Sequence, residues 1–164
     1  MHETVGGFPV LVSGGRSVAR AHCASYFCDR NPRTGVGLTP SGRLLLVVVD
    51  GRRPGWSSGM RLDEFANLFL YLGADRAMNL DGGGSSTMVV AGRVVNRPTD
   101  FTGERPVSSS LLVRSGYDPG DPKRSLTAPP ALPSALSSAD AARAALDDPG
   151  STGGMLAVLS AQRP

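Results

Sequence analysis

The fold is decided by residues 44–80, which read LLLVVVDGRRPGWSSGMRLDEFANLFLYLGADRAMNL. The stretch opens with six apolar residues without alternation, a pattern typical of a central strand buried on both faces. After a loop containing glycine and proline, apolar residues recur at helical spacing, and a short strand is predicted over 77–80. The helical positions are Leu62, Phe65, Leu68, Phe69 and Leu72. The unit therefore has the length of a strand–helix–strand crossover.

A crossover of this kind fixes where two aspartates lie. It should be right-handed and join parallel strands, so Asp50 and Asp81, which follow the two strands, should share one edge of the sheet. Open α/β sheets place ligands at that edge. The carboxylates would start about 5 Å apart if the strands are neighbours, and about 10 Å apart if one strand intervenes.

Hairpins are predicted on both sides of the crossover from turn residues between apolar runs. The expected pairs are 8–12 with 16–21, 34–39 with 43–50, and 88–90 with 94–96, and a last strand is expected over 110–113. We therefore predict an α+β fold: a mixed β-sheet with hairpins and one βαβ crossover, in a single domain.

The domain is expected to end near residue 116. Residues 117–164 contain 7 Pro and 10 Ala in 48 positions, which favours a disordered, low-complexity tail rather than a packed unit. The apolar stretch Met155 to Leu159 has the character of a docking segment, but the sequence names no partner for it. We expect a folded region over 1–116 and a tail over 117–164.

Composition and charge exclude several classes of protein. The net charge of +3 arises from 16 Arg and one Lys, with no basic block, so no nucleic-acid partner is expected. No apolar run approaches the roughly 18 residues of a membrane span, and Met1 to Phe8 lacks a signal-peptide pattern. Cys23 and Cys28 are too far apart for a Cys-x-x-Cys site, leaving a local disulfide and two thiols equally open. The oligomeric state stays open.

The loop after the second strand carries most of the chemistry. Gly82, Gly83 and Gly84 remove every side chain between the backbone and a ligand, and the hydroxyls of Ser85 and Ser86 follow directly. Such a loop is suited to cradling an anionic or hydroxylated ligand, whereas the alternative is a flexible turn. Because Asn79 and Asp81 point to one face just before it, we favour binding.

Arginines accompany both loops. Asp50-Gly51 is followed by Arg52 and Arg53, of which we interpret Arg52 as an ordinary surface charge. Together with Arg33 and Arg105, these cations indicate phosphate recognition, since a guanidinium fork matches phosphate oxygens. No Walker-type lysine, Gly-x-Ser-x-Gly motif or calcium-loop spacing is present, so we expect no metal and no cofactor.

Several of these segments, taken in order, resemble the phosphodiester glycosidase family. They are Arg33-Thr34 with Val36-Gly37-Leu38, the run Leu45 to Gly51, Gly59-Met60, Asn79 to Met88, Val94 to Pro98, and Glu104 to Val107. The resemblance covers about 5–115 and implies hydrolysis of a sugar-1-phosphodiester at the anomeric carbon. It also implies an exported bacterial protein acting on exopolysaccharide or cell-envelope glycans, although a cytoplasmic fragment is equally compatible with the residues.

For the reaction that the resemblance implies, the chemistry of the residues indicates their roles. Asp81 or Asp50 would act at the anomeric carbon as nucleophile or base, and Arg33, Arg53 and Arg105 would hold the phosphate. The remaining substrate-binding candidates are Thr34, Gly51, Asn79, Gly82, Gly83, Gly84, Ser85 and Ser86. The alternative function is a non-catalytic remnant that binds carbohydrate or phosphate.

Three departures from the family pattern are visible. The family's upstream Asn-Gly-Gly-Phe-Phe-like segment is absent, and only Val5-Gly6-Gly7-Phe8 stands near the start, so we expect an N-terminally truncated chain. Arg61 stands where members often have a helix-capping Thr. Ala91-Gly92 stands where Asn-Gly suits a turn with positive φ at both central positions.

Overall fold

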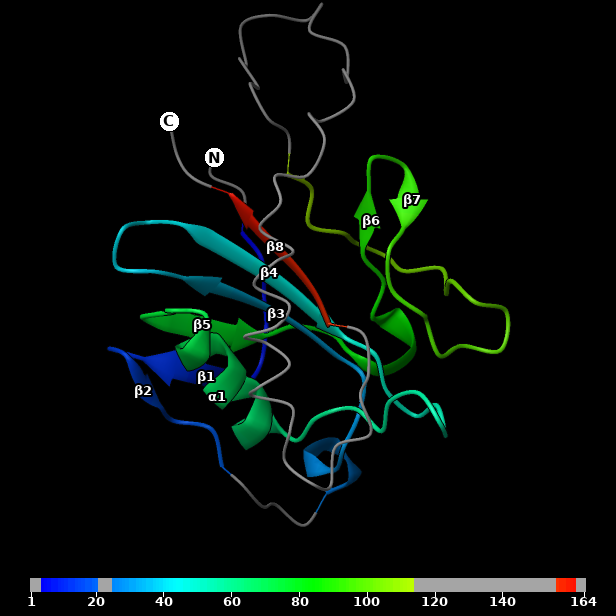
Figure 1. Ribbon diagram of the computed structural model, residues 1–164, viewed down its shortest axis with the longest axis horizontal. Helices are drawn as coiled ribbons and strands as arrows, with labels where there is room; N and C mark the ends of the chain where they lie inside the picture. Colours follow the sequence, from blue (N-terminus) through cyan, green and yellow to red (C-terminus); the bar gives the residue numbers. More distant parts are fainter. Residues whose placement is uncertain (1–3, 21–24, 114–155, 162–164) are drawn as a thin grey trace, which may run out of the picture.

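The computed structural model describes residues 4–20, 25–113 and 156–161, and a six-stranded sheet dominates it (Figure 1). The strand order is β2-β1-β5-β3-β4-β8, and a separate two-stranded ribbon, β6-β7, projects beside the sheet. The sheet strands are β1 (Val10–Ser13), β2 (Arg16–Ser17), β3 (Arg33–Leu38), β4 (Leu44–Val49), β5 (Arg76–Asn79) and β8 (Leu156–Ala161). The ribbon is β6 (Val89–Val90) and β7 (Arg93–Val94), and the helices are α1 (Leu62–Tyr71) with the 3-10 turns η1 (Tyr26–Cys28) and η2 (Gly83–Ser85).

Strand β3 separates the two strands that the crossover joins. It pairs antiparallel with β4 on one side and with β5 on the other, so β4 and β5 run in the same direction without touching. The expected mixed sheet is therefore wrong, because every pairing in the described sheet is antiparallel. The shared direction still brings the ends of β4 and β5 to one edge, with their axes roughly 10 Å apart.

Helix α1 covers one face of the sheet, and two glycines of β3 make room for it. A Cβ at Gly35 would lie 2.8 Å from the rings of Phe65 and Phe69, and one at Gly37 would lie 2.8 Å from Phe69. These rings are fully buried and meet edge to face with centroids 5.0 Å apart. The predicted apolar stripe of the helix is thus confirmed as the centre of the core.

The predicted hairpins form with the expected turns. In the β3–β4 turn, the Gly42 N–H donates to the Thr39 carbonyl at 2.9 Å. In the ribbon turn, Ala91 has φ +50° and Gly92 has φ +75°, the backbone that favours Asn-Gly there. The strand expected over 110–113 is wrong, because these residues are exposed and outside any regular element.

The C-terminal region contributes to the sheet. Strand β8 pairs antiparallel with the whole of β4, from Leu44 opposite Ala161 to Val49 opposite Leu156. Residues 156–161 depart from the expectation that 117–164 is unpacked, because they form a strand of the sheet. The rest of that region lies outside the described residues. In the described part of the chain, no helix combines the length and apolar character that a bilayer span requires.

Candidate active site

The candidate site residues gather at the sheet edge where β4 and β5 end and β3 begins (Figure 1). Glycines allow the three backbones to meet there. A Cβ at Gly51 would lie 2.6 Å from the Pro32 nitrogen, and a Cβ at Gly82 would lie 2.8 Å from the Pro32 carbonyl oxygen. The start of β3 is thus clamped between the two loops, and larger residues at either position would push the loops apart.

The glycine-rich loop is fastened to β3 by its own backbone. The Leu80 N–H donates to the Thr34 carbonyl at 2.8 Å, and the Gly83 N–H donates to the Pro32 carbonyl at 2.9 Å. A tight turn, η2, then carries the chain through Gly83–Ser85. The loop therefore has a defined conformation that is anchored on the start of β3.

Asp50 lies at the centre of a buried polar network. It is 1% exposed, and its two carboxylate oxygens accept from Trp56 Nε1 at 3.0 Å, Asn96 Nδ2 at 3.1 Å and the Arg97 N–H at 2.9 Å. The Arg97 guanidinium stacks on the Trp56 ring with 3.6 Å between Cζ and the ring centre. Asp50 therefore joins the loop after β4 to the segment after β7. Both of its carboxylate oxygens accept hydrogen bonds from the protein itself.

The same network reaches the glycine-rich loop through Asn96 and Ser86. Asn96 Nδ2 donates to the Ser86 carbonyl at 2.9 Å, and its Oδ1 accepts from the Met88 N–H at 2.8 Å. The Ser86 hydroxyl is 3.1 Å from Thr34 Oγ1. Thr34 and Ser86 are therefore in contact, and we call this pair the wall of the glycine-rich loop.

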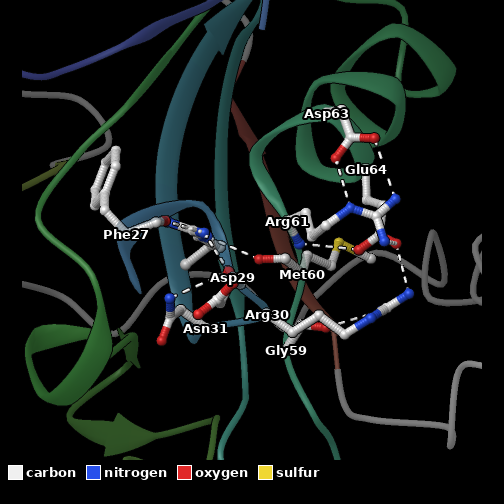
Figure 2. A network of polar contacts seen from close by, with 10 residues as sticks. Phe27, Asp29, Arg30, Asn31, Gly59, Met60, Arg61, Asp63 and Glu64 are labelled. Carbon is white, nitrogen blue, oxygen red and sulfur yellow. Dashed lines mark hydrogen bonds and ion pairs between the residues drawn. The ribbon is translucent and has the colours of Figure 1, made fainter. Parts of the chain in front are cut away.

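Arg33 is buried and directed at the backbone carbonyls of Phe27, Asp29 and Met60, three residues labelled in Figure 2. Its Nε donates to the Met60 carbonyl at 2.8 Å, and its Nη2 donates to the Phe27 and Asp29 carbonyls at 2.7 and 2.8 Å. Burial, reinforced by the nearby Arg52 charge and opposed by Glu64, lowers the pKa of Arg33 to about 10. The guanidinium remains charged at neutral pH and holds two segments, the one at Phe27 and Asp29 and the one at Met60.

The start of α1 is held beside Arg33 by ion pairs (Figure 2). Arg30 Nη2 is 2.5 Å from Glu64, and the Glu64 carboxylate also accepts from the Arg61 N–H at 2.9 Å. The Arg61 side chain contacts Asp63 at 3.1 Å. A guanidinium has no acceptor for helix amides, so Glu64 supplies the cap that the missing Thr does not.

Arg105 lies beside the glycine-rich loop. Its Nη2 donates to the Ser85 hydroxyl at 2.6 Å, and its Nε is 3.7 Å from the Asp100 carboxylate. A Cβ at Gly84 would lie 3.1 Å from Arg105 Nη1 and 2.9 Å from the Asp100 carboxylate. Arg105 thus lies against the glycine-rich loop, and its half-exposed guanidinium is accessible from solvent.

Arg53 and Asn79 donate to backbone carbonyls, while Arg53 Nε and Asn79 Oδ1 are buried without a partner in the described part of the chain. Arg53 Nη2 donates to the Pro98 carbonyl. Asn79 is 2% exposed, and its Nδ2 donates to the Phe8 and Leu80 carbonyls at 2.9 and 2.8 Å. Asn79 therefore anchors the N-terminal segment and the start of the loop.

Asp81 differs from Asp50 in being exposed. Within the described part of the chain, its carboxylate accepts no hydrogen bond and joins no ion pair. It precedes the glycine triplet directly. Among the site residues predicted from sequence, Asp81 is the carboxylate available to a ligand.

Sequence reasoning missed several residues of this edge. Asn31, Trp56 and Asn96 hold its loops together, and none of them was assigned a role. Arg52, interpreted as a surface charge, packs against Gly83, since a Cβ there would lie 3.2 Å from its Nη2. Its position directly after Asp50-Gly51 was the available signal.

Two further features bear on chemistry. Cys28 is disulfide-bonded, while the other cysteine of the chain, Cys23, lies outside the described residues. Among residues 4–20 and 25–113, no group of three or more His, Cys, Asp or Glu side chains is arranged to hold a metal ion.

Comparison with known proteins identifies the family. A family model described as phosphodiester glycosidase matches residues 1–114. The chain belongs to the phosphodiester glycosidase family. The SPbeta prophage-derived uncharacterized protein YomE of Bacillus subtilis is 37% identical over 92 residues, which are 56% of this chain and 14% of that protein. Bovine N-acetylglucosamine-1-phosphodiester alpha-N-acetylglucosaminidase is 41% identical over 68 residues, 42% of this chain and 12% of the enzyme.

A solved structure agrees with the glycosidase assignment. The zebrafish N-acetylglucosamine-1-phosphodiester alpha-N-acetylglucosaminidase catalytic domain, auto-inhibited by its pro-peptide, has a TM-score of 0.50 and 30% identity. The match covers 63% of this chain and 37% of the zebrafish chain. The chain thus spans only a small part of the length of the curated relatives that it matches.

Proposed function

We propose that this glycosidase family member hydrolyses a sugar-1-phosphodiester at the anomeric carbon. The observation that carries the proposal is the ordered glycine loop at the sheet edge, with Asp81 exposed before it and Arg105 bonded to Ser85 after it. In the reaction, the bond between the anomeric carbon and the bridging oxygen breaks, and its electrons leave with the phosphomonoester. A water oxygen replaces it on the sugar. Family membership and the named reaction of the bovine relative support this choice.

The two aspartates receive different roles in this proposal. Asp81 acts at the anomeric carbon, either as nucleophile or as the base that activates water. Asp50 is a positioning residue, because a carboxylate that is 1% exposed and already accepts three hydrogen bonds is not accessible to a ligand. It supports the wall formed by Thr34 and Ser86.

The leaving group explains the arginines. A phosphomonoester departs more readily than an alcohol, so stabilising its negative charge contributes more than protonating it. Arg105 is retained as a phosphate contact beside the amides of Gly82–Ser85. Arg33 and Arg53 donate to carbonyls, and we assign them to holding the Asp50-Gly51 and Thr34 segments in place.

We infer that this protein is exported and works in an oxidising compartment. The supporting observation is the Cys28 disulfide, since such bonds persist outside the reducing cytosol. An extracellular or envelope glycan, such as an exopolysaccharide with phosphodiester-linked sugars, is the proposed substrate class. No nucleic acid enters the proposal.

The test is release of sugar from the methyl diester of alpha-N-acetylglucosamine-1-phosphate. Replacing Asp81 by Asn should lower kcat by roughly 100- to 10,000-fold, because a positioned carboxylate contributes that much to catalysis. Thermal unfolding should not change, since the side chain is exposed and has no partner in the described part of the chain.

The matched control is Asp75→Asn. Within the described residues, the side chain of Asp75 contacts only the exposed Arg76, at the opposite end of β5. Turnover by this control should equal that of the unaltered chain. Equal turnover by the Asp81→Asn variant would remove Asp81 from the chemistry. Tight binding of the diester without any sugar release would favour the alternative, a non-catalytic binding module.

A further inference from the structure

Arg52 has an unusual backbone for its residue type. Its φ of +53° lies in the left-handed region, which is unfavourable for an L-residue with a Cβ. Strain of this kind clusters at functional sites and persists where the surroundings fix it. The position directly follows the buried Asp50 and the closely packed Gly51.

The Arg52 side chain is held in one orientation by a neutral partner. Asn31 Oδ1 accepts from its Nε at 3.0 Å and from its Nη2 at 2.8 Å. Asn31 is itself fixed, because it is 4% exposed and its Nδ2 donates to the Tyr26 and Asp29 carbonyls at 2.8 and 3.1 Å. The Tyr26 ring supports the guanidinium, with Cζ 5.1 Å from the ring centre.

This arrangement leaves the positive charge of Arg52 uncancelled. Within the described part of the chain, no carboxylate forms an ion pair with it. Its two terminal nitrogens lie over Gly83, where a Cβ would be only 3.2 and 3.3 Å away. A second cation, Arg33, is close enough that Arg52 contributes to lowering its pKa. The positive charge of Arg33 adds to the positive potential at Arg52, and this potential favours binding of an anion beside the glycine-rich loop.

We propose that Arg52 contacts the phosphate group of the substrate, with Asn31 and Tyr26 as its positioning residues. The assignment rests on the proposed function for the substrate and adds a residue that sequence reasoning set aside. Arg52 and Arg105 would then flank the glycine triplet, one beside Gly83 and the other beside Gly84. The phosphomonoester product presents the same oxygens and should bind to the same pair.

The test uses Arg52→Gly, a variant that removes the guanidinium and relieves the backbone at the same position. Methyl phosphate, the phosphomonoester left by the methyl diester, is the probe, and calorimetric titration gives its Kd. We expect binding about 10- to 100-fold weaker, the range for losing a bidentate charge-assisted contact. The thermal midpoint should stay level or rise, because glycine adopts a positive φ without strain.

Two more variants separate positioning from general damage. Arg43→Gln removes the same charge from the exposed hairpin end of the sheet and should leave the Kd unchanged. Tyr26→Leu removes the supporting ring at a residue that is 65% exposed, so folding should not suffer. It should raise KM for the diester several-fold and leave kcat near its original value.

The outcomes distinguish this assignment from the proposed reaction. One outcome is that the unaltered chain hydrolyses no diester while Arg52→Gly binds methyl phosphate more weakly than the unaltered chain does. In that case the assignment of Arg52 stands and the proposed reaction is wrong. Equal binding of methyl phosphate by the unaltered chain and by Arg52→Gly overturns the assignment. Failure of the unaltered chain to bind methyl phosphate overturns it as well.

Discussion

At the residue scale, burial separates side chains that look alike in the sequence. Asp50 and Asp81 both follow a strand and precede a glycine, yet the first is 1% exposed with three donors and the second is exposed. Arg33 was predicted to contact the ligand and Arg52 to be a surface charge. In the structure, Arg33 is buried and donates to backbone carbonyls. Residue type and strand position predicted where these groups gather, but their partners come from loops that are distant in sequence.

Ala91 provides a prediction at this scale. Its φ of +50° is unfavourable for alanine, whereas asparagine tolerates the left-handed region. Ala91→Asn should therefore raise the free energy of unfolding by about 0.5 to 1 kcal/mol. Urea denaturation followed by circular dichroism measures the change.

The comparison variant is Gly92→Ala in the same turn. Its φ of +75° makes a Cβ unfavourable, so this variant should lose about 1 kcal/mol. If Ala91→Asn is less stable than the unaltered chain, the turn does not have the conformation described.

At the scale of elements, periodicity and turn chemistry predicted most of the fold. The helix over 62–71 and the hairpins follow from local patterns, and all of them form. The insertion of β3 between β4 and β5 could not be predicted from the sequence. Strand order depends on contacts between distant residues, such as Gly35 against the aromatic rings of α1. Residues 110–113 have strand-like composition, but no partner strand pairs with them in the described structure.

The first turn of α1 carries a pH-dependent contribution. Partial burial raises the pKa of Asp63, but the hydrogen bond and charge of Arg61 outweigh it and bring the pKa below the usual 3.8. Because the folded value is depressed, this contribution is fully present above about pH 4 and is lost as pH falls through the folded value. Asp63→Asn should therefore destabilise the protein at pH 7.

The measurement is the thermal midpoint of both proteins from pH 7 down to pH 2. The difference between them should shrink as Asp63 becomes protonated in the unaltered chain. A difference that stays constant over this range would show that the charge of Asp63 contributes nothing to the helix start.

At the scale of the whole molecule, the C-terminal strand matters for the sheet. Composition indicated an unpacked tail over 117–164, since proline and alanine dominate it, but β8 covers the edge of β4. The apolar stretch Met155 to Leu159 suggested a docking segment, but the sequence did not indicate β4 as its partner. Without β8, the apolar strand β4 would become an exposed edge prone to association.

Truncation after residue 150 tests the contribution of β8. The shortened chain should unfold at a lower temperature, by about 4 to 8 °C for each kcal/mol lost, and should self-associate. Removing only 162–164 keeps β8 and serves as the control. Identical unfolding curves for the two truncated chains would show that β8 adds nothing to stability.

The central claim concerns the edge where β4 and β5 end, and a titration followed by backbone amide NMR tests it most directly. Methyl phosphate and the methyl diester of N-acetylglucosamine-1-phosphate are added to the uniformly labelled Asp81→Asn variant, so that the diester persists. We expect the largest shifts at the amides of Gly82, Gly83 and Gly84. Shifts confined to the opposite edge, at Gly42 and Gly73, with an unchanged glycine-rich loop, would contradict the account.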